Sequence, residues 1–216
     1  MSLPAPLAGL LAAVFLAAAA LCTVSLWRRR ARHEGPVAAA EANHVVMALG
    51  MAAMVLPATA TALPPLAGAV LFGVIGVAWT VRLVALRARG RALGSPIGGD
   101  RCAAHPTHLL LSNAAMVVMY AVMLPSGGTA GHAGHAGHGA ASPLALSAVG
   151  VALALYLLVH AGATVAVLVR ASAPVAVTVG GGGGPGPVGR FVDAPAVQLG
   201  CQAVTGAGMA LMLLVH

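Results

Sequence analysis

Long apolar segments, separated by stretches that hold most of the charge, constrain this chain more than any other feature. The 216 residues are 60% hydrophobic and 7% charged, whereas a soluble domain carries about 25% charged residues. A helix needs about 20 apolar residues to cross a bilayer, and only helices or closed barrels can span one. Because the segments here are continuous rather than alternating, they predict an all-α polytopic transmembrane helical bundle.

The apolar segments predict six transmembrane helices in a single integral membrane domain, residues 1–216. Two longer connections interrupt the series: a His-rich loop at 126–142 and a Gly-rich loop at 171–193. We expect the helices at about residues 3–27, 37–56, 66–86, 106–124, 143–169 and 194–215.

The positive charges indicate how the helices are oriented. All eleven are arginines, and they lie in or beside every second connection. The cluster Arg28 to Arg32 follows the first apolar segment, whereas the basic region of a secretory signal peptide precedes it. Because positively charged loops stay in the cytoplasm, we expect a retained first helix, both termini outside, the His-rich loop outside and the Gly-rich loop inside. Only 3% of the residues are aromatic, so no nucleic-acid partner is expected.

Methionines are confined to alternate predicted helices: apart from Met1, all lie on the second, fourth and sixth. At about 100° per residue, each of these helices carries its methionines on one face, with a histidine or cysteine nearer the inner end. The second and third sets share the spacing of eight and then three residues, and this correspondence predicts three helical hairpins. The three sets are His44, Met47, Met51 and Met54; His108, Met116, Met119 and Met123; and Cys201, Met209, Met212 and His216.

These side chains favour the binding or passage of a soft metal ion, with copper as the best match. Thioether, thiolate and imidazole groups select Cu(I). Uncharged thioethers cost less to bury than carboxylates, and a series of weak sites suits conduction. In the outer loop, His132, His135 and His138 would collect the ion. The alternative is that the methionines only pack, because methionine readily fills gaps in apolar cores.

Two other functions also fit the sequence. His44 and His160, facing each other across the bundle, could ligate haem in a redox component. A structural or partner-binding membrane subunit would need no ligand at all. An enzyme is not expected, because the chain has no nucleophile motif, no HExxH motif and no phosphate-binding loop. Asn113, Gln198 and Gln202 are expected to form hydrogen bonds between helices.

The same stretches resemble an uncharacterised actinobacterial family of small, His/Met-rich polytopic membrane proteins. The resemblance rests on His44-Val-Val-Met-Ala-Leu-Gly-Met-Ala-Ala-Met54, on His108-Leu-Leu-Leu-Ser-Asn-Ala-Ala-Met-Val-Val-Met119 and on residues 194–212, and it covers nearly the whole chain. It implies a bacterial cytoplasmic (plasma) membrane location and no established activity. The spacing Met47-x-x-x-Met51 is also similar in kind to the methionine filter of copper-transporter trimers, a likeness of chemistry rather than of fold.

Overall fold

The computed structural model describes residues 4–56, 63–90, 105–124, 143–171 and 195–215, and these residues form six helices and no strand. The predicted all-α bundle is therefore confirmed, and each predicted boundary lies within about one helical turn of the observed one. Apart from Ala171, the His-rich and Gly-rich loops lie outside the described residues. The helices are α1 (Ala5–Ala31), α2 (Gly35–Val55), α3 (Pro65–Ala88), α4 (Pro106–Val122), α5 (Pro143–Ala171) and α7 (Pro195–Val215).

Proline begins these helices and arginine ends several of them. Helices α1 to α4 have proline at the first or second helical position, and α5 and α7 start at Pro143 and Pro195. Proline suits this position because its fixed φ is helical and no hydrogen-bond donor is needed there. In α1 the last turn carries three arginines, Arg28 to Arg30, which complement the negative end of the helix dipole.

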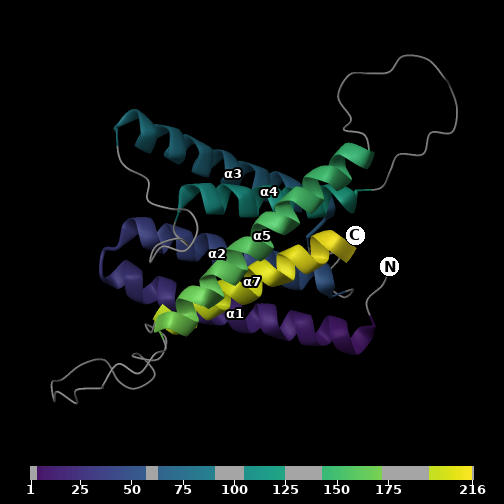
Figure 1. Cartoon of the computed structure of the whole chain (residues 1–216), viewed down its shortest axis with the longest axis horizontal. Helices are drawn as coiled ribbons and strands as arrows, with labels where there is room; N and C mark the ends of the chain where they lie inside the picture. Colours follow the sequence, from purple (N-terminus) through teal and green to yellow (C-terminus); the bar gives the residue numbers. More distant parts are fainter. Residues whose placement is uncertain (1–3, 57–62, 91–104, 125–142, 172–194, 216) are drawn as a thin grey trace, which may run out of the picture.

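The helices pack as three antiparallel hairpins, as predicted. The most extensive contacts join α1 to α2, α3 to α4, and α5 to α7. Helices α2, α4 and α7 also contact one another, so the second member of each hairpin reaches the centre of the bundle. Figure 1 shows the α5–α7 hairpin crossing the other helices obliquely, with α1 beginning and α7 ending at the same end of the bundle.

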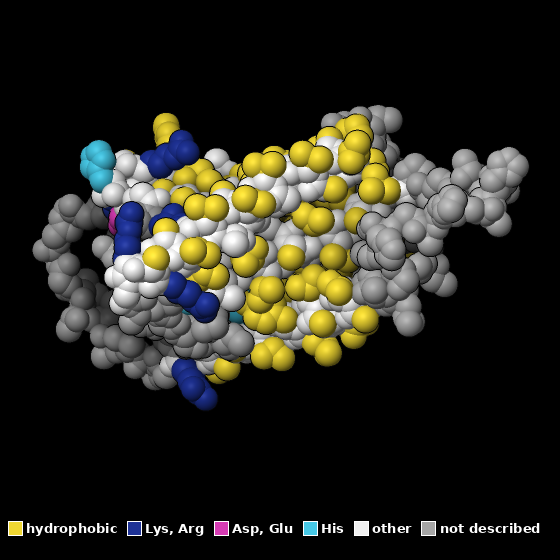
Figure 2. All heavy atoms as spheres, turned by 90° about the horizontal axis from the view of Figure 1, so that it is seen from above, with side chains coloured by type: hydrophobic (Ala, Val, Ile, Leu, Met, Phe, Trp, Pro, Cys, Tyr) yellow, Lys and Arg dark blue, Asp and Glu magenta, His cyan; other side chains and the backbone are white. Residues whose placement is uncertain are grey.

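The arginines of the described residues gather at the opposite end, which we call the arginine end. Figure 2 shows them at one end of the molecule, with apolar side chains over much of the remaining visible surface. Helices α1, α2, α3 and α5 are each long and apolar enough to cross a membrane. The 17-residue α4 and residues 199–215 of α7 are shorter apolar helices. The arginine end comprises Arg28, Arg29, Arg30, Arg32, Arg87, Arg89 and Arg170.

The bundle is apolar outside and partly polar inside. One face of α3 carries valines at helical spacing that are 56–64% exposed, a surface suited to lipid rather than water. The interior instead encloses histidines, asparagines, serines, threonines and one glutamate. The exposed valines are Val70, Val74, Val77, Val81 and Val84.

Close packing between α3 and α4 yields a first prediction. A Cβ added at Gly68 would overlap the ring of Tyr120, whereas one added at Gly73 on the same helix would meet nothing within 4 Å. We expect Gly68→Ala to destabilise the protein by about 1–3 kcal/mol through overpacking. Gly73→Ala should be neutral or stabilising because alanine favours the helix. Thermal unfolding in detergent measures both, and equal midpoints for the two variants would contradict this packing.

Candidate functional site

The methionines of α2, α4 and α7 converge in one apolar core. Six of them are 7% exposed or less and belong to a single cluster with Phe15, Phe72 and Tyr120. Met54 is half-buried against this cluster, and Met123, the residue that caps the end of α4, is half-buried. The methionine-bearing faces of the three helices therefore meet in one interior cluster. The methionine core comprises Met47, Met51, Met116, Met119, Met209 and Met212.

Three buried histidines, which we call the histidine column, lie beside the methionine core. His44 comes from α2, His108 from α4 and His160 from α5, and each is 5% exposed or less. The rings of His108 and His160 stack with centroids 3.7 Å apart and an angle of 8° between their planes. The His44 and His108 centroids are 6.4 Å apart. The sequence indicates His160 only as a candidate haem ligand and does not predict that its ring lies next to that of His108.

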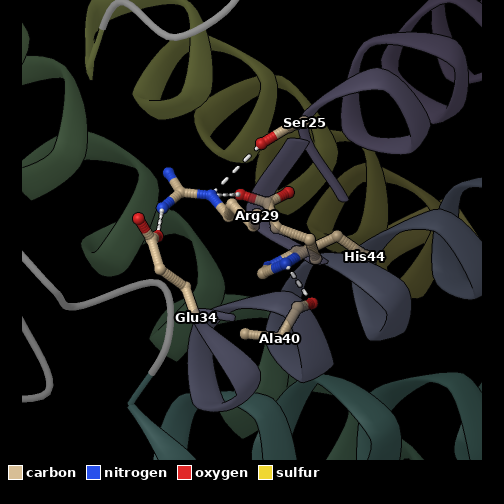
Figure 3. A network of polar contacts seen from close by, with 6 residues as sticks. Ser25, Arg29, Glu34, Ala40 and His44 are labelled. Atoms are coloured by element: carbon tan, nitrogen blue, oxygen red, sulfur yellow. Dashed lines mark hydrogen bonds and ion pairs between the residues drawn. The ribbon is translucent and has the colours of Figure 1, made fainter. Parts of the chain in front are cut away.

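The hydrogen bonding of His44 leaves one ring nitrogen as a lone-pair donor. Its Nδ1 lies 2.8 Å from the carbonyl oxygen of Ala40, visible in Figure 3. Because a carbonyl can only accept, Nδ1 carries the proton, and Nε2 of the neutral ring is an acceptor. Nε2 of His44 and Nε2 of His160 are both buried, and neither has a hydrogen-bond partner among the described residues. Histidines that bind metals commonly donate the other ring N–H to a backbone carbonyl in this way.

A tyrosine from α5 holds the middle ring of the column. The hydroxyl of Tyr156 lies 3.2 Å from Nδ1 of His108, and its ring is tilted against both His108 and His160. Tyr156 and His160 are four residues apart on α5, so they share a helix face. The same helix therefore supplies both the hydroxyl near His108 and the ring stacked on it.

Next to the column, an asparagine network joins α2, α3 and α4. Oδ1 of Asn43 accepts hydrogen bonds from Nδ2 of Asn113 at 3.0 Å and from Nε1 of Trp79 at 3.3 Å. Nδ2 of Asn43 donates to the sulfur of Met47 at 3.6 Å. The prediction that Asn113 bonds between helices is confirmed. The network also fixes the position of one core sulfur.

A second polar group lies nearer the arginine end. Arg29 donates to Glu34 at 2.8 Å and to Ser25 at 3.3 Å, and its Nε lies 3.6 Å from the buried carboxylate of Glu41. Figure 3 shows the Arg29 guanidinium between Ser25 and Glu34. The thiol of Cys22 hydrogen-bonds to Glu41, and Cys201 lies near both groups. The sequence predicts Cys201 as a metal ligand near the inner end of its helix, as it does His44. The neighbours identified for Cys201 are Cys22 and Glu41.

The described side chains do not form a ready-made metal site of imidazole, thiolate or carboxylate ligands. Within the described ranges, no group of three or more His, Cys, Asp or Glu side chains is placed to hold a metal ion. Methionine sulfurs are a separate ligand class, and six of them are buried beside the column. The role of these residues as metal ligands stays a prediction. The predicted collecting group His132, His135 and His138 lies outside the described residues.

Comparison with known proteins assigns the chain to a family without a known activity. The profile of a family described as "Domain of unknown function (DUF5134)" matches residues 36–216. This match covers most of the chain, so the chain belongs to that family. No curated protein and no solved structure matches it. The expected membership of an uncharacterised family is therefore confirmed, while the actinobacterial and His/Met-rich character of that family stays a prediction.

The asparagine network yields a second prediction. Asn43→Leu leaves the buried donors of Trp79 and Asn113 without their shared acceptor, which should cost about 1–2 kcal/mol. In a Trp27→Phe background Trp79 is the remaining tryptophan, so its emission should shift as the thermal midpoint falls. The control is Thr80→Ala, because the Thr80 hydroxyl bonds to Gly76 within its own helix. An unchanged Trp79 emission in Asn43→Leu would show that the network is not formed.

Proposed function

We propose that this member of the DUF5134 family is a multi-pass protein of the bacterial cytoplasmic membrane that binds a soft metal ion, Cu(I), within its helical bundle. The arginine end would face the cytoplasm and both termini the outside, in accord with the positive-inside rule. The histidine column would supply imidazole nitrogens, and the methionine core would supply thioether sulfurs along the path of the ion.

One observation carries this proposal: the buried Nε2 atoms of His44 and His160 have no hydrogen-bond partner in the part of the chain that the structure describes. Each such atom costs about 1–3 kcal/mol when it is left unsatisfied. Ionisable side chains inside a membrane bundle commonly mark ion or substrate sites. An apolar residue would fill the same space without that cost. A metal ion would use the lone pairs that packing alone leaves unused.

The surrounding ligands favour a monovalent soft ion over a divalent one. Imidazole and thioether groups are neutral donors, and they are the side chains that soft Cu(I) prefers. The buried carboxylate of Glu41 lies beside the guanidinium of Arg29, so it is already paired with a positive charge. A site of neutral ligands does not offset the charge of an ion, and burying a single charge costs less than burying two. Cu(I) fits this environment better than Zn(II) or Cu(II).

Binding requires the histidine column to rearrange. The lone pairs of an imidazole lie in the plane of the ring, so the nearly parallel rings of His108 and His160, 8° apart in plane, do not direct their nitrogens to one point. A bound ion would require the two rings to rotate until their nitrogens point to one position. Because the hydroxyl of Tyr156 lies next to His108, rotation of the His108 ring would change the surroundings of this tyrosine. The apo and copper-bound proteins should therefore differ in the environment of this tyrosine.

Copper binding to purified protein tests the proposal. We expect stoichiometric Cu(I) after anaerobic loading in detergent, measured by mass spectrometry and by competition with a chelator of known affinity. His132, His135 and His138 are first replaced by alanine so that the outer loop does not contribute. His44→Leu and His160→Leu should each weaken binding by about 100-fold or more, beyond the effect typical of an outer-shell change. Met47→Leu with Met116→Leu should also weaken it.

The controls separate ligation from packing. His105→Asn changes a histidine outside the column and retains a side chain suited to the helix start, so it should bind copper normally. Met→Leu conserves volume and costs less than about 1.5 kcal/mol, so loss of copper in a folded variant reports a lost ligand. No copper in the loaded protein would overturn the proposal. A haem absorption band in place of copper would support the redox alternative instead.

A further inference from the structure

The interior of the bundle is divided into a polar half and an apolar half. The buried polar side chains of the described residues lie in the half of each helix nearer the arginine end, except Thr205, which is at the middle of α7. The methionine core lies in the other half, together with Phe15, Phe72 and Tyr120. The bundle therefore has a dry interior towards its termini and a polar interior towards its arginines.

Within the polar half, five buried polar side-chain atoms have no hydrogen-bond partner in the described part of the chain. They come from α2, α4, α5 and α7, which contact one another around the bundle centre. The atoms are His44 Nε2, Ser112 Oγ, Asn113 Oδ1, His160 Nε2 and Gln202 Oε1.

These atoms lie at similar depth in the bundle. His44 and His160 belong to the histidine column. Ser112 lies one turn from His108 on the same face of α4. Gly206 packs against the turn of α5 from Leu157 to Ala161, and Gln202 is one turn from Gly206 towards the arginine end.

Their chemistry calls for a ligand that donates hydrogen bonds. His44 Nε2 is an acceptor because Nδ1 carries the proton, and the amide oxygen of Gln202 can only accept. The Ser112 hydroxyl can donate or accept. A buried water is bound by two to four polar partners in sites of this kind.

We propose that His44, Ser112, His160 and Gln202 line a hydrated chamber that binds water and opens towards the arginine end. Polar side chains continue in that direction: Glu41 lies one turn before His44 on α2 and close to Arg29, and Cys201 directly precedes Gln202 on α7. On the other side the methionine core excludes water. A hydrated cation would thus reach the histidines from the arginine side, and it would have to exchange its water for thioether ligands to enter the methionine core beyond them. The identity of that cation rests on the proposed function, but the chamber itself does not.

Thiol labelling in sealed vesicles tests this chamber. Cys22, Cys102 and Cys201 are replaced by alanine, and single cysteines are introduced as Ser112→Cys, Ala115→Cys or Trp27→Cys. A small membrane-impermeant cationic methanethiosulfonate is then added to right-side-out and to inverted vesicles. Trp27 is 82% exposed at the arginine end, so Trp27→Cys reports the accessible side. Ala115 is buried in the core cluster with the methionines, so Ala115→Cys reports the dry interior.

We expect Ser112→Cys to react from the same side as Trp27→Cys, and faster than Ala115→Cys by on the order of tenfold. Gln202→Cys, on a different helix, gives the same test if Ser112→Cys does not fold. Reaction of both chamber cysteines from the opposite side, or no faster than Ala115→Cys in a folded protein, would overturn the proposal. Labelling needs no copper, so this outcome is independent of the copper measurements.

Discussion

Polar side chains that cannot face lipid determine how this bundle is assembled. Nothing in a bilayer core satisfies a hydrogen bond, so a polar group on a membrane-crossing helix either turns inward or, like the exposed Thr23 and Thr80, bonds to a carbonyl of its own helix. The inward-facing side chains include Asn43 and His44 in the first half of α2, Asn113 in the first half of α4, and His160 on α5. The histidine column and the asparagine network follow from this constraint. The exposed surface is left to valine and leucine.

Small residues let the helices come close enough for this interior to form. Gly50 on α2 lies against Phe72 and Met116, and its carbonyl accepts a hydrogen bond from the Tyr120 hydroxyl at 3.2 Å. Gly208 on α7 receives the ring of Phe15 from α1. Small residues at helix contacts are the usual means of close approach in membranes. The methionines then fill the irregular space at the centre, which their flexible side chains suit. Packing and metal binding are therefore compatible roles for the same residues.

Much of the fold could be predicted from the sequence, because its strongest signals are local. Apolar length and proline positions locate the helices, and the arginines identify one end of the bundle. The methionine faces on α2 and α4 were predictable from spacing alone. The place of His160 was harder to predict, because α5 is apolar over most of its surface and few residues indicate which face turns inward. Its Tyr156–His160–Thr164 series, four residues apart, was the available signal. Cys201 was predicted with the histidines, yet its neighbours are Cys22 and Glu41, a pairing that depends on how α7 packs beside α1.

The central claim is that imidazole nitrogens and thioether sulfurs in the bundle interior bind one soft ion together. X-ray absorption spectroscopy at the copper edge of the loaded protein, with the outer-loop histidines removed, tests it most directly. The account predicts both nitrogen and sulfur neighbours of Cu(I), with the nitrogen contribution reduced in His44→Leu and the sulfur contribution reduced in Met47→Leu. A copper spectrum without sulfur, or one unchanged by both substitutions, would contradict it.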